Sequence, residues 1–125
     1  MNHDILHRLR TICLALPETI EQNEGSVGKP VFKVRNKIFA MQHLMEDRPS
    51  LWCKSTLSFQ EMLVSSEPER YFVPPYVGHH GWIGIWLDVD LDWGFIGHLV
   101  EESYRKTAPK KLSAGIGQNK RQATG

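Results

Sequence analysis

Residues 30–41 read PVFKVRNKIFAM, and this stretch decides the fold because it specifies a β-hairpin. Apolar residues alternate with others on both sides of Arg35-Asn36, as in strands whose two faces meet different surroundings. A two-residue turn at this dipeptide places Phe32 opposite Phe39, so the two rings should share one face. Asn36 suits the positive φ that such turns need, and Arg35 suits it less well.

The segment before the hairpin predicts an N-terminal helix. An apolar stripe at helical spacing begins after a capping residue, Asn2 or Asp4, and runs to Leu16. Pro17 disfavours helical geometry in the residue before it and therefore ends the helix. Residues 19–23 are a candidate for a short strand.

The segment after the hairpin predicts more sheet and a short helix. The second hairpin strand extends to Leu44, residues 46–50 form a turn, and residues 51–54 form another strand. Ser58 and Glu61 have the spacing of a capping box, in which each side chain satisfies a free backbone donor at a helix start.

Residues 71–92 combine a rigid loop with a strand. A Pro-Pro pair and two glycines make residues 71–81 a loop, and residues 82–88 then alternate as a strand. Asp92 is placed to cap the final helix. One strand face carries Ile83, Ile85 and Leu87, and the other carries Trp82, Gly84 and Trp86.

This order of elements predicts one α+β domain over residues 1–113. Most connections are short enough for hairpins, so a sheet of about five strands should be largely antiparallel, with the helices on one face. The length of 125 residues fits one domain. Residues 114–125 are small, polar and basic, and we predict a disordered C-terminal tail.

The cysteines and the N-terminus indicate a cytoplasmic protein. Cys13 and Cys53 lie in apolar patterns and are typical of buried thiols in a reducing compartment. The first residues lack the features of a signal peptide, and no apolar stretch approaches the roughly 20 residues of a membrane helix. We therefore expect no membrane partner.

No segment carries a convincing catalytic or metal-binding motif. Asp88-Val-Asp-Leu-Asp92 resembles a phosphatase nucleophile motif, but the glycine and hydroxyl residues that should follow are absent, so we interpret it as a strand end and helix cap. His79 and His80 are adjacent in a loop, whereas zinc needs three or four converging ligands. We expect no catalytic residue, metal or cofactor. An enzyme or small-ligand site at the 76–82 loop, with His79 or His80 and a carboxylate in one pocket, is a third hypothesis.

Charge is distributed unevenly along the chain. From Arg105 onward there are six basic residues and no acidic ones, whereas the preceding 104 residues hold nine basic and fourteen acidic residues. Basic residues at the hairpin and near the C-terminus are suited to contact nucleic-acid phosphates. The alternative is solubilising charge that complements a helix dipole. The two clusters contain Lys33, Arg35, Lys37, Arg105, Lys106, Lys110 and Lys111.

Two indoles on one strand face suggest an interaction surface. If the opposite face packs on helices, Trp82 and Trp86 form a flat shelf for a nucleobase, a peptide or a second subunit. Tyr76 and His80 lie just before this strand and complete the candidate surface. The other interpretation is that a loop or the C-terminal segment covers the indoles.

Several segments together resemble the MmcQ/YjbR family, and the match covers most of residues 5–112. The resemblance implies a small α+β fold with helices on one side of an antiparallel sheet, related to the secretion-chaperone-like and CyaY-like architectures. The family is commonly labelled DNA-binding. We therefore expect a non-enzymatic binding module, possible partners being DNA and, alternatively, a protein or a second copy of the chain. The segments are, in order, Leu16-Pro17-Glu18, Phe32-Lys-Val34, Lys37-Ile-Phe-Ala40, Pro74-Pro-Tyr-Val-Gly78, Gly81-Trp82, Asp92-Trp93 and Ser103-Tyr104.

Overall fold

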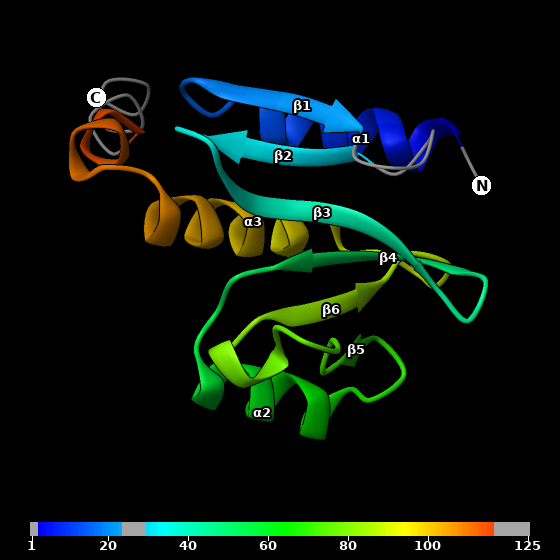
Figure 1. Ribbon diagram of the computed structural model, residues 1–125. Helices are drawn as coiled ribbons and strands as arrows, with labels where there is room; N and C mark the ends of the chain where they lie inside the picture. The colour runs from blue at the N-terminus through cyan, green and yellow to red at the C-terminus, as the bar shows by residue number, and fades with distance from the viewer. Residues whose placement is uncertain (1–2, 24–29, 117–125) are drawn as a thin grey trace.

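The described residues, 3–23 and 30–116, form a six-stranded antiparallel sheet with helices packed against it (Figure 1, a computed structural model). The strand order is β1-β2-β3-β4-β6-β5. A further helical segment spans residues 110–116. The elements are α1 (His3–Leu14), β1 (Thr19–Asn23), β2 (Pro30–Val34), β3 (Lys37–Met45), β4 (Arg48–Cys53), α2 (Leu57–Ser66), β5 (Tyr71–Phe72), the 3-10 turn η1 (Gly78–His80), β6 (Ile83–Trp86) and α3 (Trp93–Thr107).

The α+β class and the antiparallel sheet are confirmed. Helices α1 and α3 lie across the same face of the sheet, and α2 lies beyond the β5 edge (Figure 1). The sheet has six strands rather than about five, because the two-residue strand β5 lies in the stretch predicted as loop. The core between α3 and the sheet includes Phe32, Phe39, Leu51, Ile83, Val100 and Tyr104.

The two-residue turns of the sheet use positive φ angles. Arg35 and Asn36 have φ of 51° and 66°, which confirms the predicted turn and matches the twist of hairpin strands. A second turn at Glu46-Asp47, with φ of 53° and 62°, joins β3 to β4. The turn predicted over residues 46–50 is therefore too long, since β4 begins directly after it.

The predicted register of the first hairpin is wrong by one residue beyond the turn. Phe32 lies opposite Ala40 rather than Phe39, because the pairing shifts at a β-bulge. Phe39 instead turns its ring toward α3, where it meets the ring of Tyr104 edge-on at 5.4 Å. The hydroxyl of Ser103 donates to the carbonyl of Phe39, the residue that the β2–β3 pairing skips, so α3 stabilises the bulge.

The predicted capping box at Ser58 and Glu61 is wrong, because the N-cap of α2 is Thr56. Thr56 Oγ1 accepts a hydrogen bond from the Phe59 amide at 3.1 Å, whereas Ser58 already lies in the first helical turn. The Ser55 amide donates to the Gly81 carbonyl at 3.1 Å and keeps the chain extended up to Thr56. This tertiary bond, which the local sequence pattern does not include, decides where the helix begins.

The chain ends agree with the sequence only in part. The candidate strand over residues 19–23 is confirmed as β1, and α1 ends at Leu14 rather than Leu16. Residues 114–116, assigned to the tail from the sequence, are helical, and Ile116 is 7% exposed within the core. The remaining tail residues lie outside the described part of the chain. Among the described helices, none has the length and apolar character needed to cross a membrane.

Candidate nucleic-acid interface and an acidic pocket

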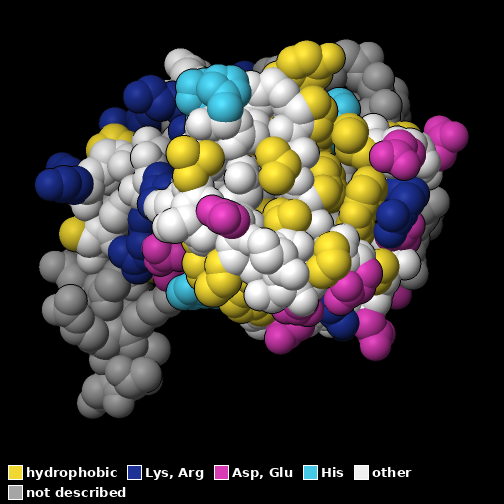
Figure 2. Space-filling model, turned by 90° about the horizontal axis from the view of Figure 1, so that it is seen from below, with side chains coloured by type: hydrophobic (Ala, Val, Ile, Leu, Met, Phe, Trp, Pro, Cys, Tyr) yellow, Lys and Arg dark blue, Asp and Glu magenta, His cyan; other side chains and the backbone are white. Residues whose placement is uncertain are grey.

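The two ends of the sheet carry opposite charge. In Figure 2 most Lys and Arg side chains gather on one side of the molecule and most Asp and Glu side chains on the other. The basic end, at the β2–β3 turn and the C-terminus of α3, comprises Arg35, Lys37, Lys54, Arg105, Lys106, Lys110 and Lys111. The acidic end, at the β3–β4 turn and the start of α3, comprises Glu46, Asp47, Glu67, Asp88, Asp90 and Asp92.

Glu18 links the two basic clusters that the sequence predicts. Arg35 donates to its carboxylate twice, at 2.6 and 3.0 Å. This pairing lowers the pKa of Glu18, and the charge of Lys111 lowers that pKa further. Lys111 therefore lies close to the hairpin turn, although the two are far apart in the sequence.

Lys54 extends the basic end and was not singled out from the sequence. Burial lowers its pKa, and the neighbouring charge of Lys37 lowers that pKa further. Lys54 and Lys106 line one cavity of about 170 Å³ between the start of α2 and α3. The Lys54 ammonium also lies 5.9 Å from the ring centroid of Trp82. A single lysine at a strand end carries no sequence signal, and only the packing of α3 beside β3 and β4 brings these groups together.

The cations of the basic end differ in their availability for a ligand. Arg35 is paired with Glu18, and Arg105 lies 3.4 Å from Glu101. Lys33 is half-buried on β2. In the residues that the structure describes, no ion pair engages the exposed side chains of Lys37, Lys106, Lys110 and Lys111.

The indoles of Trp82 and Trp86 do not form the exposed shelf considered from the sequence. Each is only 7% exposed. The Phe72 ring packs against Trp86 with the ring centroids 4.3 Å apart and the planes tilted by 31°, and it lies over Gly84, where an added Cβ would overlap it. The Arg48 guanidinium covers Trp86 at 3.9 Å from its ring centroid. The indoles are therefore buried, as the alternative interpretation predicted, but Trp86 is covered by the edge strand β5 and a charged side chain rather than by a loop or the C-terminal segment.

Two members of the predicted interaction surface remain exposed. Tyr76 is 88% exposed and has a φ of 68°, and His80 is exposed beside His79, whose ring lies 3.9 Å away. Among residues 3–23 and 30–116, no group of three or more His, Cys, Asp or Glu side chains is arranged to hold a metal ion.

The side chains that resembled catalytic groups have structural roles. Burial raises the pKa of the Cys13 thiol, and it raises that of Cys53 to about 12, so neither forms a thiolate readily at neutral pH. Asp88 accepts two hydrogen bonds from Arg48, each at 2.8 Å, which lowers its pKa. Asp92 caps α3 as predicted.

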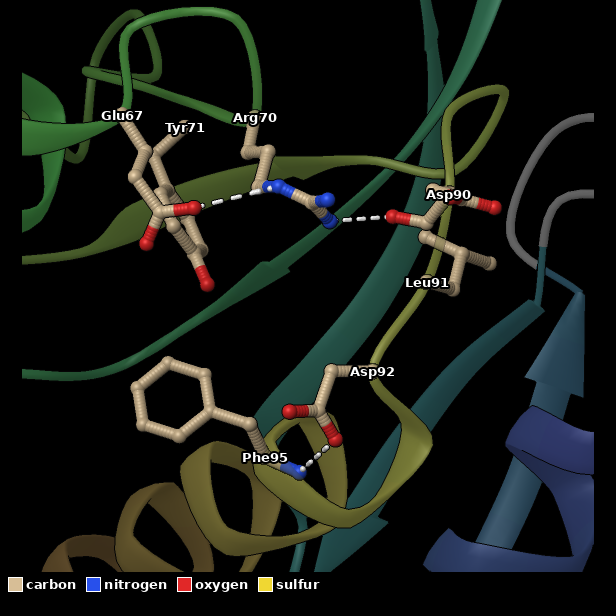
Figure 3. Close-up of a pocket in the computed structure, with 7 residues that line it drawn as sticks. All are labelled: Glu67, Arg70, Tyr71, Asp90, Leu91, Asp92 and Phe95. Carbon is tan, nitrogen blue, oxygen red and sulfur yellow. Dashed lines mark hydrogen bonds and ion pairs between the residues drawn. The ribbon is translucent and has the colours of Figure 1, made fainter.

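A cavity of about 530 Å³ opens at the acidic end, between the α2–β5 turn and the start of α3 (Figure 3). We call it the acidic pocket. On one wall, Arg70 Nε lies 3.1 Å from Glu67 Oε1, and Arg70 Nη1 donates to the Asp90 carbonyl. On the other wall, Asp92 Oδ1 accepts from the Phe95 amide at 3.1 Å. Sequence analysis missed this pocket, because its walls come from two separate segments.

A family model places the chain among known proteins. The model described as YjbR matches residues 14–106. The chain belongs to the YjbR family. The resemblance deduced from the ordered segments is thereby confirmed, and the YjbR match includes the sheet, α2 and most of α3.

A solved structure supports the fold of this YjbR chain. The Deinococcus radiodurans protein DR2400, described as a DUF419 domain, superimposes with a TM-score of 0.69 at 23% identity. The match covers 79% of this chain and 75% of DR2400. At this identity the likeness concerns the fold alone. Comparison with curated proteins gives no match.

Proposed function

We propose that this YjbR-family protein is a non-enzymatic module that binds the phosphate backbone of nucleic acid, DNA in the first instance, with its basic end. The observation that supports this proposal is the meeting of two sequence-distant basic clusters at one end of the fold. Lys111 lies near the Arg35–Glu18 pair, and Lys54 lies near Lys37 and Lys106.

Lysine side chains at the basic end suit non-specific phosphate contact. A lysine ammonium is a mobile point charge that positions a backbone without reading bases. The four exposed lysines without ion pairs can neutralise phosphates and release counterions. The acidic end would turn away from a polyanion, so the charge separation orients the protein on approach.

Contact with the backbone is favoured over base stacking. Stacking requires exposed aromatic rings beside the cations. Trp82 and Trp86 are buried, which leaves Tyr76 as the exposed aromatic side chain of the candidate surface, and Lys54 lies over the Trp82 ring. The raised pKa values of the thiols and the structural roles of Asp88 and Asp92 are consistent with a module that performs no chemistry.

Fluorescence anisotropy with a labelled DNA duplex tests this function. With about four phosphate contacts, the slope of log K against log salt is about −3.6, so affinity falls about 150-fold between about 50 and 200 mM salt. Replacing Lys106 by glutamine should weaken binding and reduce the slope by about 0.9.

Arg8→Gln is the matched control, because Arg8 is exposed on α1 and lies outside the basic end. It removes the same charge and should leave both affinity and slope unchanged. The proposal fails if the full chain shows no saturable binding at 50 mM salt and tens of micromolar protein. It also fails if Arg8→Gln weakens binding as much as Lys106→Gln.

A further inference from the structure

The acidic pocket is lined by a tyrosine whose ring is buried and whose hydroxyl faces the cavity. Tyr71 is 6% exposed, and its ring meets that of Phe95 edge-on at 6.5 Å. Its hydroxyl points into the space between Glu67 and Arg70 on one wall and Asp92 and Phe95 on the other (Figure 3). In the described part of the chain this hydroxyl makes no hydrogen bond. The hydroxyl opens onto the cavity, so it is available to a ligand both as a donor and as an acceptor.

Two carboxylates face the same space as the Tyr71 hydroxyl. Burial raises the pKa of Tyr71, and the charges of Glu67 and Asp92 raise it further, whereas Arg70 lowers it. Both carboxylates therefore lie close enough to act on the phenol. Asp92 uses one oxygen for the Phe95 amide, and its other oxygen points into the pocket (Figure 3).

The electrostatics of the acidic pocket favour a cation over an anion. The Arg70 guanidinium is already held by Glu67 and by the Asp90 carbonyl. The amide of Phe95 at the start of α3 is capped by Asp92, so that donor is not free for an anion. The charged side chains that line the space are three carboxylates, of Glu67, Asp90 and Asp92, and one guanidinium, so the lining carries a net negative charge beside a phenol that both donates and accepts.

We propose that the acidic pocket binds a small aliphatic amine, whose ammonium group contacts Glu67, Asp92 and the Tyr71 hydroxyl. An ammonium has three donors, which matches these three acceptors. The carbon stem lies against the Phe95 ring and the side chain of Leu91, which also line the cavity. A volume of about 530 Å³ suits a small molecule rather than a flat macromolecular surface. This site is at the opposite end from the basic end and does not depend on nucleic-acid binding.

Calorimetric titration of the full chain with 1,4-diaminobutane at low salt tests the proposal, and amide chemical shifts in NMR spectra locate the site. We expect saturable binding, with the largest shifts at Tyr71, Asp92 and Phe95. The neutral diol 1,4-butanediol has the same length and should not bind. Tyr71→Phe keeps the ring and should weaken binding about fivefold, which corresponds to one hydrogen bond.

Asp92→Asn removes a charge while keeping a good helix cap, so the variant should fold and bind the diamine about tenfold more weakly. Asp47→Asn is the control, because it removes one carboxylate from the same end outside the pocket, at a positive φ that Asn tolerates. Its affinity should change less than twofold. The proposal is overturned if the diamine does not saturate, if the diol binds equally, or if Asp47→Asn weakens binding as much as Asp92→Asn.

Discussion

Replacing Ser103 by alanine removes one hydroxyl on which two backbone groups depend. The side chain is fully buried, donates to the Phe39 carbonyl at the bulge of β3, and accepts from the Lys54 amide at 2.8 Å. These two bonds join α3 to the ends of two strands. Alanine leaves both backbone groups without their partner and supplies no hydrogen bond in its place.

The expected loss of stability follows from the number of backbone groups that lose their hydrogen-bond partner. A buried backbone group without a partner costs about 1–3 kcal/mol. The Phe39 carbonyl belongs to a fully buried residue. Lys54 is half-buried, so the cost of leaving its amide unpaired lies at the lower end of that range. Alanine is the better helix former by about 0.5 kcal/mol, which offsets part of the loss. We therefore expect Ser103→Ala to lower the free energy of unfolding by about 2–3 kcal/mol.

Urea denaturation followed by tryptophan fluorescence measures this change, and the slope m should stay constant. The control is Ser65→Ala on the exposed side of α2, which should alter the free energy of unfolding by less than about 0.5 kcal/mol. A loss below about 1 kcal/mol for Ser103→Ala would refute the view that this hydroxyl satisfies both backbone groups.

Three further substitution or labelling experiments check the fold. Thr56→Ala should lower the free energy of unfolding by about 1 kcal/mol and Ser58→Ala by less than about 0.5 kcal/mol in urea melts; equal effects would argue against Thr56 as the cap. Gly84→Ala should lower the free energy of unfolding by about 1–3 kcal/mol, because the new Cβ displaces the ring of Phe72. Gly97→Ala, whose new Cβ meets no atom within 4 Å, should be neutral or stabilising. An unchanged thermal melting temperature for Gly84→Ala would contradict the packing of Phe72 on Gly84. The Cys53 thiol, with a pKa of about 12, should resist a thiol-specific chromogenic reagent at neutral pH until urea unfolds the chain, and prompt labelling of the native protein would contradict its burial.

Local chemistry was enough to predict most of the elements. Strand alternation and the turn residues predicted the hairpin at Arg35-Asn36, and the capping residue Asp92 marked the start of α3. Such signals act over a few neighbouring residues, so a linear pattern contains them. The predicted register beyond the turn was wrong for the opposite reason, because the bulge at Phe39 depends on a hydroxyl from α3. The predicted start of α2 was wrong likewise, because it depends on a hydrogen bond to Gly81.

By itself, the sequence determined the α+β class, the family resemblance and the presence of two basic clusters, since these follow from residue order and local pattern. Only the tertiary structure decided what those residues do together. The strand order and the packing of α3 brought Lys54 beside Lys37 and Lys106, buried Trp86 under Phe72, and closed the acidic pocket around Tyr71. Each of these outcomes depends on contacts between segments far apart in the chain, and such contacts are set by sheet order and burial rather than by sequence spacing.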